Sequence, residues 1–81
     1  MKKIDFKFIE DVYRKALNLK KYKLTVNSKF EEVPGWDSFG HMRLISEIEK
    51  KLKISFDIEE FVGVNTVKKI MKLVQSKLNK K

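Results

Sequence analysis

Hydrophobic residues recur near the beginning of the chain at intervals of three or four, the spacing of one face of an α-helix. Positions 4, 8, 12 and 16 and positions 9, 13 and 17 are all apolar or aromatic. This pattern predicts a first amphipathic helix over residues 4–19. Lys20 and Lys21 follow it and complement the negative end of the helix dipole.

The next segment, residues 20–36, shows no clean period and ends in Pro34-Gly35. A stretch of this length without regular structure is uncommon in a compact domain unless it is functional or wraps the core. We therefore expect a long loop pinned by scattered apolar anchors. These anchors are Leu24, Val26, Phe30 and Val33.

A second helix is expected over residues 37–53. Asp37 and Ser38 are both good N-cap residues, and an apolar stripe follows them at helical spacing. The stripe consists of Phe39, Met42, Ile45, Ile48 and Leu52, with Leu44 beside it.

Two shorter patterns complete the chain. Residues 57–61 are expected to form a short helical turn, with Asp57 as its cap and Gly63 as its terminator. A last helix is expected over residues 66–79, where the apolar positions again follow helical spacing and lysines cover the opposite side.

The fold class follows from these patterns, because no segment alternates apolar and polar residues for long enough to predict a strand. We expect one all-α domain over residues 1–81, a small bundle of three to four helices with a long loop between the first two. A chain of this size buries only about 60–65% of its unfolded surface. Since an enzyme needs a scaffold and a walled cleft, we expect no catalytic residues.

Composition excludes several kinds of site. There is no cysteine and a single histidine, so disulfides, thiolate chemistry and a histidine-rich metal site are ruled out, and we expect no metal. The apolar runs are far shorter than the roughly 18 residues that a membrane span requires. The expected location is a reducing cytoplasm.

The formal net charge of +8 suggests an alternative function, because lysines bind phosphates. Residues 1–24 carry eight basic and three acidic side chains, and residues 50–81 carry nine and three. Residues 25–49 instead hold two basic and five acidic side chains. A small basic helical domain that binds nucleic acid or another anionic partner therefore stays open as the alternative, although the positive charge lies on either side of the central segment.

That central segment contains the stretch VPGWDSFGHMRLI, which holds the only proline, the only tryptophan and the only histidine of the chain. Ser38 lies at the predicted helix start, where unpaired N–H groups and the positive end of the dipole favour an anion. Asp37 adds negative charge suited to attracting a basic partner. We interpret Gly40 as keeping the surface beside Ser38 low, so that a bulky group can approach.

Several of these residues have a simpler interpretation. Ser38 could serve only as an N-cap, a role that Asp37 could share. His41 is expected at the surface, partly exposed beside Ser38. Trp36 is expected to cover the core rather than to bind a partner, and Met42 is expected to belong to the core.

The segment from Trp36 to Val74, WDSFGHMRLISEIEKKLKISFDIEEFVGVNTVKKIMKLV, resembles the acyl carrier protein family. Asp37-Ser38-Phe39 is similar to the Asp-Ser-Leu of that family, with Phe in place of Leu. The amphipathic helix, the isoleucine-containing turn and the Thr-Val pair at the last helix are also similar. The resemblance covers residues 33–75, while the first helix matches only in pattern and position.

The resemblance implies that Ser38 carries 4′-phosphopantetheine, transferred from coenzyme A by a phosphopantetheinyl transferase. The thiol of this arm would hold acyl or aminoacyl groups as thioesters for loading ligases and acyltransferases, and the carrier itself would be a non-catalytic monomer. The second helix would dock partner enzymes, with Asp37, Phe39, Met42, Arg43 and Glu47 as candidates. Residues lining the acyl chain would be Ile45, Ile48, Phe61 and Val62.

Two features depart from the fatty-acid carriers of this family. Those carriers are usually strongly acidic, whereas this chain has a net charge of +8. The stretch WDSFGHM is more similar to stand-alone carriers of specialised pathways. We therefore hypothesise that like-charge repulsion rejects housekeeping fatty-acid synthase components.

Overall fold

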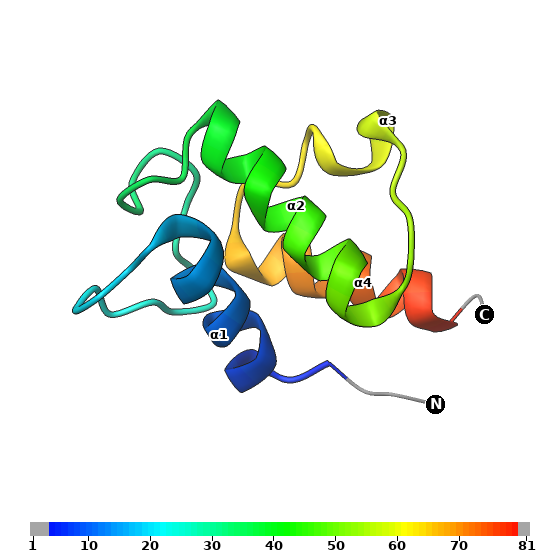
Figure 1. The fold of residues 1–81 in the computed structure, drawn as a ribbon, viewed down its shortest axis with the longest axis horizontal. Helices are drawn as coiled ribbons and strands as arrows, with labels where there is room; N and C mark the ends of the chain where they lie inside the picture. The colour runs from blue at the N-terminus through cyan, green and yellow to red at the C-terminus, as the bar shows by residue number, and fades with distance from the viewer. Residues whose placement is uncertain (1–3, 80–81) are drawn as a thin grey trace.

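The computed structural model describes residues 4–79 and has four helices. They are α1 (Phe6–Leu17), α2 (Ser38–Leu52), α3 (Ile58–Phe61) and α4 (Val67–Asn79). No strand occurs in this part of the chain, where the only β-type pairing is an isolated bridge between Lys29 and Thr66. The predicted all-α bundle is confirmed. Figure 1 shows α2 crossing the molecule diagonally. Helix α1 packs against α2, and α4 contacts α1 and α3.

Each helix begins one or two residues inside its predicted range, and α1 and α2 also end inside theirs, because capping residues lie outside the helix itself. Asp5 caps α1 by accepting a hydrogen bond from the Phe8 N–H at 2.9 Å. Asn18 and Lys53 end α1 and α2 in the left-handed conformation, each with φ of 56°. The predicted start of the first helix at residue 4 and its end at residue 19 were therefore too wide.

The connection between α1 and α2 docks on the beginning of α4. The carbonyl oxygens of Val26 and Ser28 accept hydrogen bonds from the N–H groups of Lys68 and Val67, at 2.9 and 3.1 Å. These donors belong to the first turn of α4 and have no partner within the helix. The loop thus supplies their acceptors. Val26 holds the loop through its backbone, and its side chain is exposed, which corrects its prediction as an apolar anchor.

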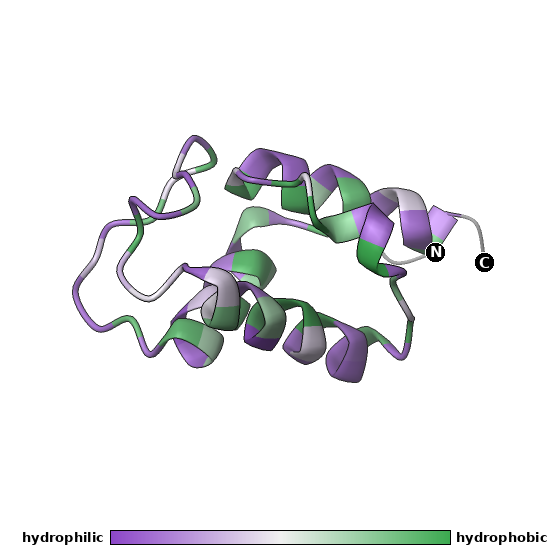
Figure 2. Cartoon of the chain, turned by 90° about the horizontal axis from the view of Figure 1, so that it is seen from above, coloured by the Kyte–Doolittle hydropathy of each residue, from purple (hydrophilic) through white to green (hydrophobic). Residues whose placement is uncertain are grey.

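The core lies between α1, α2 and α4, and buries the apolar faces that the sequence pattern identified. Its fully buried side chains include Ile9, Val12, Tyr13, Trp36, Leu44, Ile48, Ile70 and Val74. Hydrophobic and hydrophilic segments alternate along each long helix in Figure 2, as expected for amphipathic helices around one core. None of the described helices combines the length and apolar character that a membrane span needs.

Candidate functional site

The candidate site is the beginning of α2, where a tight turn leads into the helix. In Val33-Pro34-Gly35-Trp36 the Trp36 N–H donates to the Val33 carbonyl at 3.0 Å. Proline presets the second position of such a turn, and the φ of 81° at Gly35 is one that glycine adopts without strain. The turn therefore sets the direction in which the chain enters α2.

Asp37 caps the helix and leaves Ser38 free. Its Oδ1 accepts a hydrogen bond from the Gly40 N–H at 2.9 Å, and its backbone carbonyl accepts one from the His41 N–H at 2.7 Å. Ser38 is the first residue of α2 and is exposed. Its hydroxyl makes no hydrogen bond with any residue in the described part of the chain. The alternative in which Ser38 is the N-cap is wrong, because Asp37 has that role.

Gly40 is buried. The prediction that it leaves space at the surface for a group attached to Ser38 is therefore wrong. A Cβ at this position would lie within van der Waals overlap of the Gly35 carbonyl oxygen and 2.8 Å from Leu17 Cδ2. The first turn of α2 therefore packs directly on the preceding turn and on the end of α1. Glycine is required here for helix packing, on the side of α2 that faces the core.

His41 is also buried, with 8% of its surface exposed, so the prediction of a partly exposed residue was wrong. Its Nδ1 accepts a hydrogen bond from the Trp36 indole N–H at 2.8 Å. Because the indole can only donate, Nε2 carries the ring proton and donates to the Phe61 carbonyl at 2.8 Å. The histidine thus joins the turn, α2 and α3, and both ring nitrogens are satisfied.

Trp36 is buried in the core, as predicted, with 1% of its surface exposed. Its ring lies edge-on to Tyr13, with centroids 4.9 Å apart, and stacks on His41 at 6.0 Å. The rare residues of this stretch therefore fix the geometry around Ser38, while the serine hydroxyl itself faces solvent.

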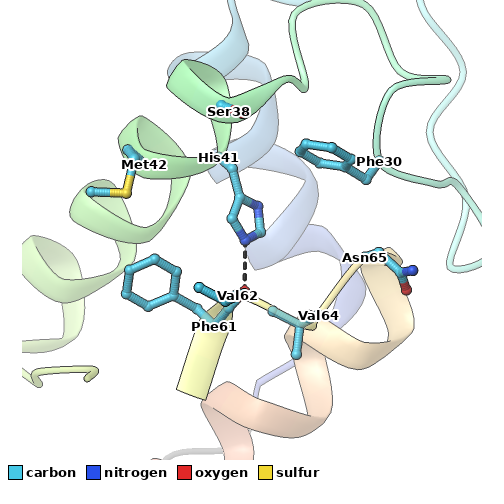
Figure 3. Close-up of a pocket in the computed structure, with 8 residues that line it drawn as sticks. All are labelled: Phe30, Ser38, His41, Met42, Phe61, Val62, Val64 and Asn65. Carbon is cyan, nitrogen blue, oxygen red and sulfur yellow. Dashed lines mark hydrogen bonds between the residues drawn. The ribbon is translucent and has the colours of Figure 1, made fainter. Parts of the chain in front are cut away.

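A cavity of about 300 Å³ opens beside Ser38, between α2 and α3 (Figure 3). Its wall is mostly apolar. The lining residues are Phe30, Ser38, His41, Met42, Phe61, Val62, Val64 and Asn65. Since both nitrogens of His41 are engaged by the protein, the interior offers little hydrogen bonding and suits an apolar group.

The sequence located only part of this cavity. Phe61 and Val62 lie in its wall, but Ile45 and Ile48 are buried in the core and do not line it. Met42 was predicted as a core residue and instead has 55% of its surface exposed at the cavity. Phe30, Val64 and Asn65 were not predicted. Phe30 was identified as an anchor of the loop, but no periodic pattern indicates that the loop closes the cavity.

The five candidate docking residues differ in their surroundings. Phe39 is the most exposed of the large apolar side chains, at 78%, and Asp37, Met42 and Arg43 are exposed as well. Glu47 is half-buried, and its Oε1 lies 3.6 Å from Lys15 Nζ of α1. The first four therefore share an accessible surface near Ser38, whereas Glu47 faces α1.

The described residues bring together no cluster of three or more histidine, aspartate or glutamate side chains that could hold a metal ion. The chemistry available at this site is that of a free hydroxyl at a helix start. The first N–H groups of α2 and its dipole favour an anionic group there. A phosphodiester on Ser38 fits this site, and the cavity offers an apolar surface next to it.

Comparisons with known proteins agree with this geometry. A family model described as a phosphopantetheine attachment site matches residues 7–74. Among solved structures, the chain is similar to a holo acyl carrier protein from Geobacter metallireducens, determined by NMR in solution. The sequence identity is 27%, the TM-score is 0.80, and the match covers 91% of this chain and 85% of the other. A search of curated proteins gave no significant match.

Proposed function

Since the chain belongs to the phosphopantetheine-attachment family, we propose that Ser38 is the residue that carries the arm. The protein is an acyl carrier protein, a non-catalytic carrier with covalent 4′-phosphopantetheine, and the nucleic-acid alternative is not favoured. The arm supplies a thiol that holds acyl groups as thioesters. The observation that supports Ser38 is its exposed hydroxyl. Ser38 is the first residue of α2 and lies beside the apolar cavity.

The residues around Ser38 have separate roles in this proposal. Asp37 occupies one N–H of the first turn through its side chain, while the earlier N–H groups and the dipole stabilise the phosphodiester. His41 and Trp36 hold α3 beside α2, so that Phe61 and Val62 keep their places in the cavity wall. The apolar wall then shelters an acyl chain from water.

The proposal is tested by intact-protein mass spectrometry after incubation with coenzyme A and a broad-specificity phosphopantetheinyl transferase. We expect wild type to gain the mass of one phosphopantetheine and Ser38→Ala to gain none. Ser76→Ala is the matched control, because Ser76 is an exposed serine of α4 and should leave modification unchanged. Wild type that stays unmodified with several transferases would contradict the proposal.

The family implies partner enzymes such as a phosphopantetheinyl transferase. We propose that loading ligases and acyltransferases also act on this carrier, and that they contact Asp37, Phe39, Met42 and Arg43. A cytoplasmic location is proposed with them, because the transferase draws the arm from coenzyme A.

We further propose that the carrier serves a specialised pathway rather than housekeeping fatty-acid synthesis. The net charge of +8 supports this, because fatty-acid carriers are usually acidic. Fatty-acid synthase components should therefore load malonyl groups onto the holo protein poorly. Efficient malonyl loading would contradict this assignment while leaving the role of Ser38 intact.

A further inference from the structure

Two segments that contain no acidic residue meet at the start of α4. They are residues 18–29, in the loop after α1, and residues 66–79, which comprise α4 and the residue before it. Backbone carbonyls of the loop accept hydrogen bonds from the first N–H groups of α4, and Lys29 forms the isolated bridge with Thr66. Lysines of the loop and of the helix are therefore brought to one surface.

Four exposed lysines gather where the loop meets the helix. Lys68, Lys69 and Lys72 lie on the side of α4 that faces away from its buried residues. Lys29 is exposed beside the start of the helix. Val26 adjoins them, because its carbonyl accepts a hydrogen bond from the Lys68 N–H at 2.9 Å, and its side chain is 39% exposed. We call these five residues the cationic surface.

This arrangement of charge is unfavourable for the isolated fold. Lys68 and Lys72 are four residues apart, so their like charges repel each other on one helix face. Lys68 and Lys69 lie in the first turn, which holds no acidic residue, at the positive end of the helix dipole. No ion pair with a described residue neutralises the four lysines. Clustered like charges that lower stability and lack counter-charges indicate an anionic partner.

The backbone of α4 offers this partner no further donors. The N–H groups of Val67 and Lys68 donate to loop carbonyls. The Lys69 N–H donates to Thr66 Oγ1 at 3.1 Å. An anion would therefore be held by lysine side chains alone, which are point charges on flexible stems. Such charges suit a surface that carries many phosphates better than a single phosphate held in one orientation.

The carboxylates nearest to the cationic surface mark its borders. Glu31 and Glu32 follow the loop segment and are exposed, but they line a hollow beside the start of α2. Glu60 of α3 binds Lys77 in the second half of α4. Asp5 lies near the same half, because the N–H of the preceding residue binds a side chain there. Within these borders the surface carries four positive charges and no carboxylate.

The residue types favour a lipid surface over a nucleic acid. Proteins recognise bases through arginine forks and through stacking on exposed aromatic rings. The two segments without acidic residues contain no arginine, and their one aromatic residue, Tyr22, is half-buried. Lysine clusters are instead typical of surfaces that bind anionic lipid headgroups, and the exposed Val26 adds an apolar contact with the interface.

We propose that the cationic surface binds the headgroups of an anionic lipid bilayer. Asn65 precedes α4 and lines the cavity on the side opposite Met42 (Figure 3). The bilayer therefore lies on the α4 side of the cavity. The binding itself does not depend on Ser38. Where Ser38 carries the arm proposed above, its acyl group is brought close to the bilayer.

The test measures how much unmodified protein sediments with large vesicles. The vesicles consist of phosphatidylcholine alone or with about 30 mol% phosphatidylglycerol, in about 0.1 M salt. Wild type is compared with Lys68→Gln/Lys72→Gln. The control is Lys50→Gln/Lys51→Gln at the end of α2, which removes the same charge at two exposed lysines. Circular dichroism establishes that each variant is folded.

Wild type should bind the anionic vesicles at least about tenfold more tightly than the neutral ones, and about 0.5 M salt should abolish the difference. Each lysine at an anionic surface contributes about fivefold, so Lys68→Gln/Lys72→Gln should weaken binding about 25-fold. Its Tm should be no lower than that of wild type, because the change relieves repulsion. The control pair should weaken binding less than about threefold. Equal losses for the two pairs, or equal binding to both kinds of vesicle, would overturn the inference.

Two further comparisons separate this proposal from its alternatives. Duplex DNA or single-stranded RNA, added at the phosphate concentration of the vesicles, should leave most of the protein on the anionic vesicles. Complete displacement would reject the lipid assignment in favour of nucleic acid. Ser38→Ala should bind vesicles as wild type does. Absence of vesicle binding by wild type rejects only the cationic surface, whereas a chain that binds vesicles but stays unmodified rejects only the carrier assignment of Ser38.

Discussion

His41 shows how a single side chain positions the site. Its two ring nitrogens have opposite hydrogen-bonding roles, one towards the Trp36 indole and one towards the Phe61 carbonyl. The ring is therefore held between the loop before α2 and the helix beyond the cavity. With one donor and one acceptor nitrogen, the ring satisfies both partners. His41 therefore has a structural role and is not available as a base for the hydroxyl of Ser38.

Gly40 offers a sharp test of packing at the same helix start. An added Cβ would overlap the Gly35 carbonyl oxygen, a backbone atom that cannot move without shifting the turn. We expect Gly40→Ala to lower the free energy of unfolding by about 2–3 kcal/mol, because overpacking outweighs the gain of about 1 kcal/mol in helix propensity. Urea denaturation measures this change.

Gly63 provides the control for that experiment. A Cβ there would meet no atom within 4 Å. Gly63→Ala should therefore leave stability unchanged or raise it by roughly 0.4–1 kcal/mol, through the reduced entropy of the unfolded chain. If the two alanine variants proved equally stable, the direct contact between the helix start and the turn would be wrong.

Tyr13 gives a prediction about pH. Burial raises the pKa of its phenol above the ordinary value of 10.0, and its hydroxyl has no hydrogen-bond partner among the described residues. The folded state then keeps a proton that the unfolded state loses above pH 10. This contribution to stability is fully present below that pH and falls by about 1.4 kcal/mol per unit above it.

Tyr13→Phe removes both the titration of the buried phenol and its unsatisfied hydroxyl. We expect the variant to be at least as stable as wild type at neutral pH, since it buries no unsatisfied hydroxyl. Its stability should also fall less steeply than that of wild type between about pH 10 and 11. Parallel slopes in urea titrations of the two proteins over this range would show that the phenol is not buried as described.

At the scale of elements, α3 depends on its neighbours. A four-residue helix cannot be stable alone, because the free energy cost of nucleating a helix exceeds the stabilisation that a single hydrogen-bonded turn provides. It is tied to α2 through His41 and to α4 through Lys77, whose Nζ lies 2.7 and 2.8 Å from the two carboxylate oxygens of Glu60. The position of this side of the cavity therefore depends on these two contacts.

Lys77→Met should loosen α3 without unfolding the domain, because methionine keeps the apolar stem and removes the charge. We expect hydrogen exchange at the Val62 N–H, which bonds the Ile58 carbonyl, to accelerate about three- to tenfold. Global stability should fall by no more than about 1 kcal/mol, as for a partly exposed ion pair. Lys72→Met, at an exposed position of α4, is the control and should change neither value.

At the scale of the whole molecule, the cargo is expected to stabilise the fold when it enters the cavity. Each buried methylene contributes about 0.8 kcal/mol, so an octanoyl group should stabilise the protein more than an acetyl group. A gain of about 1 kcal/mol would raise Tm by roughly 4–8 °C in a domain of this size. Calorimetry of the two loaded forms measures the difference.

Met42→Ala should reduce that difference, because Met42 forms part of the cavity wall while contributing little to the core. A cargo of equal length that ends in a carboxylate should give a smaller shift, since an unpaired charge is costly in an apolar cavity. Identical Tm values for the octanoyl and acetyl forms would indicate that the chain remains in solvent.

The sequence by itself determined the helices, because their apolar residues recur at a period that only a helix places on one face. It also located the helix start at Asp37-Ser38, since capping depends on neighbouring residues, and its motif gave the family. The roles of Gly40, His41 and Met42 were decided only by the tertiary structure. A helical pattern fixes which residues share a face, but their burial depends on the turn, on α1 and on α3, which are distant in sequence. The cavity likewise combines the loop, α2 and α3, so no local pattern could have defined its wall.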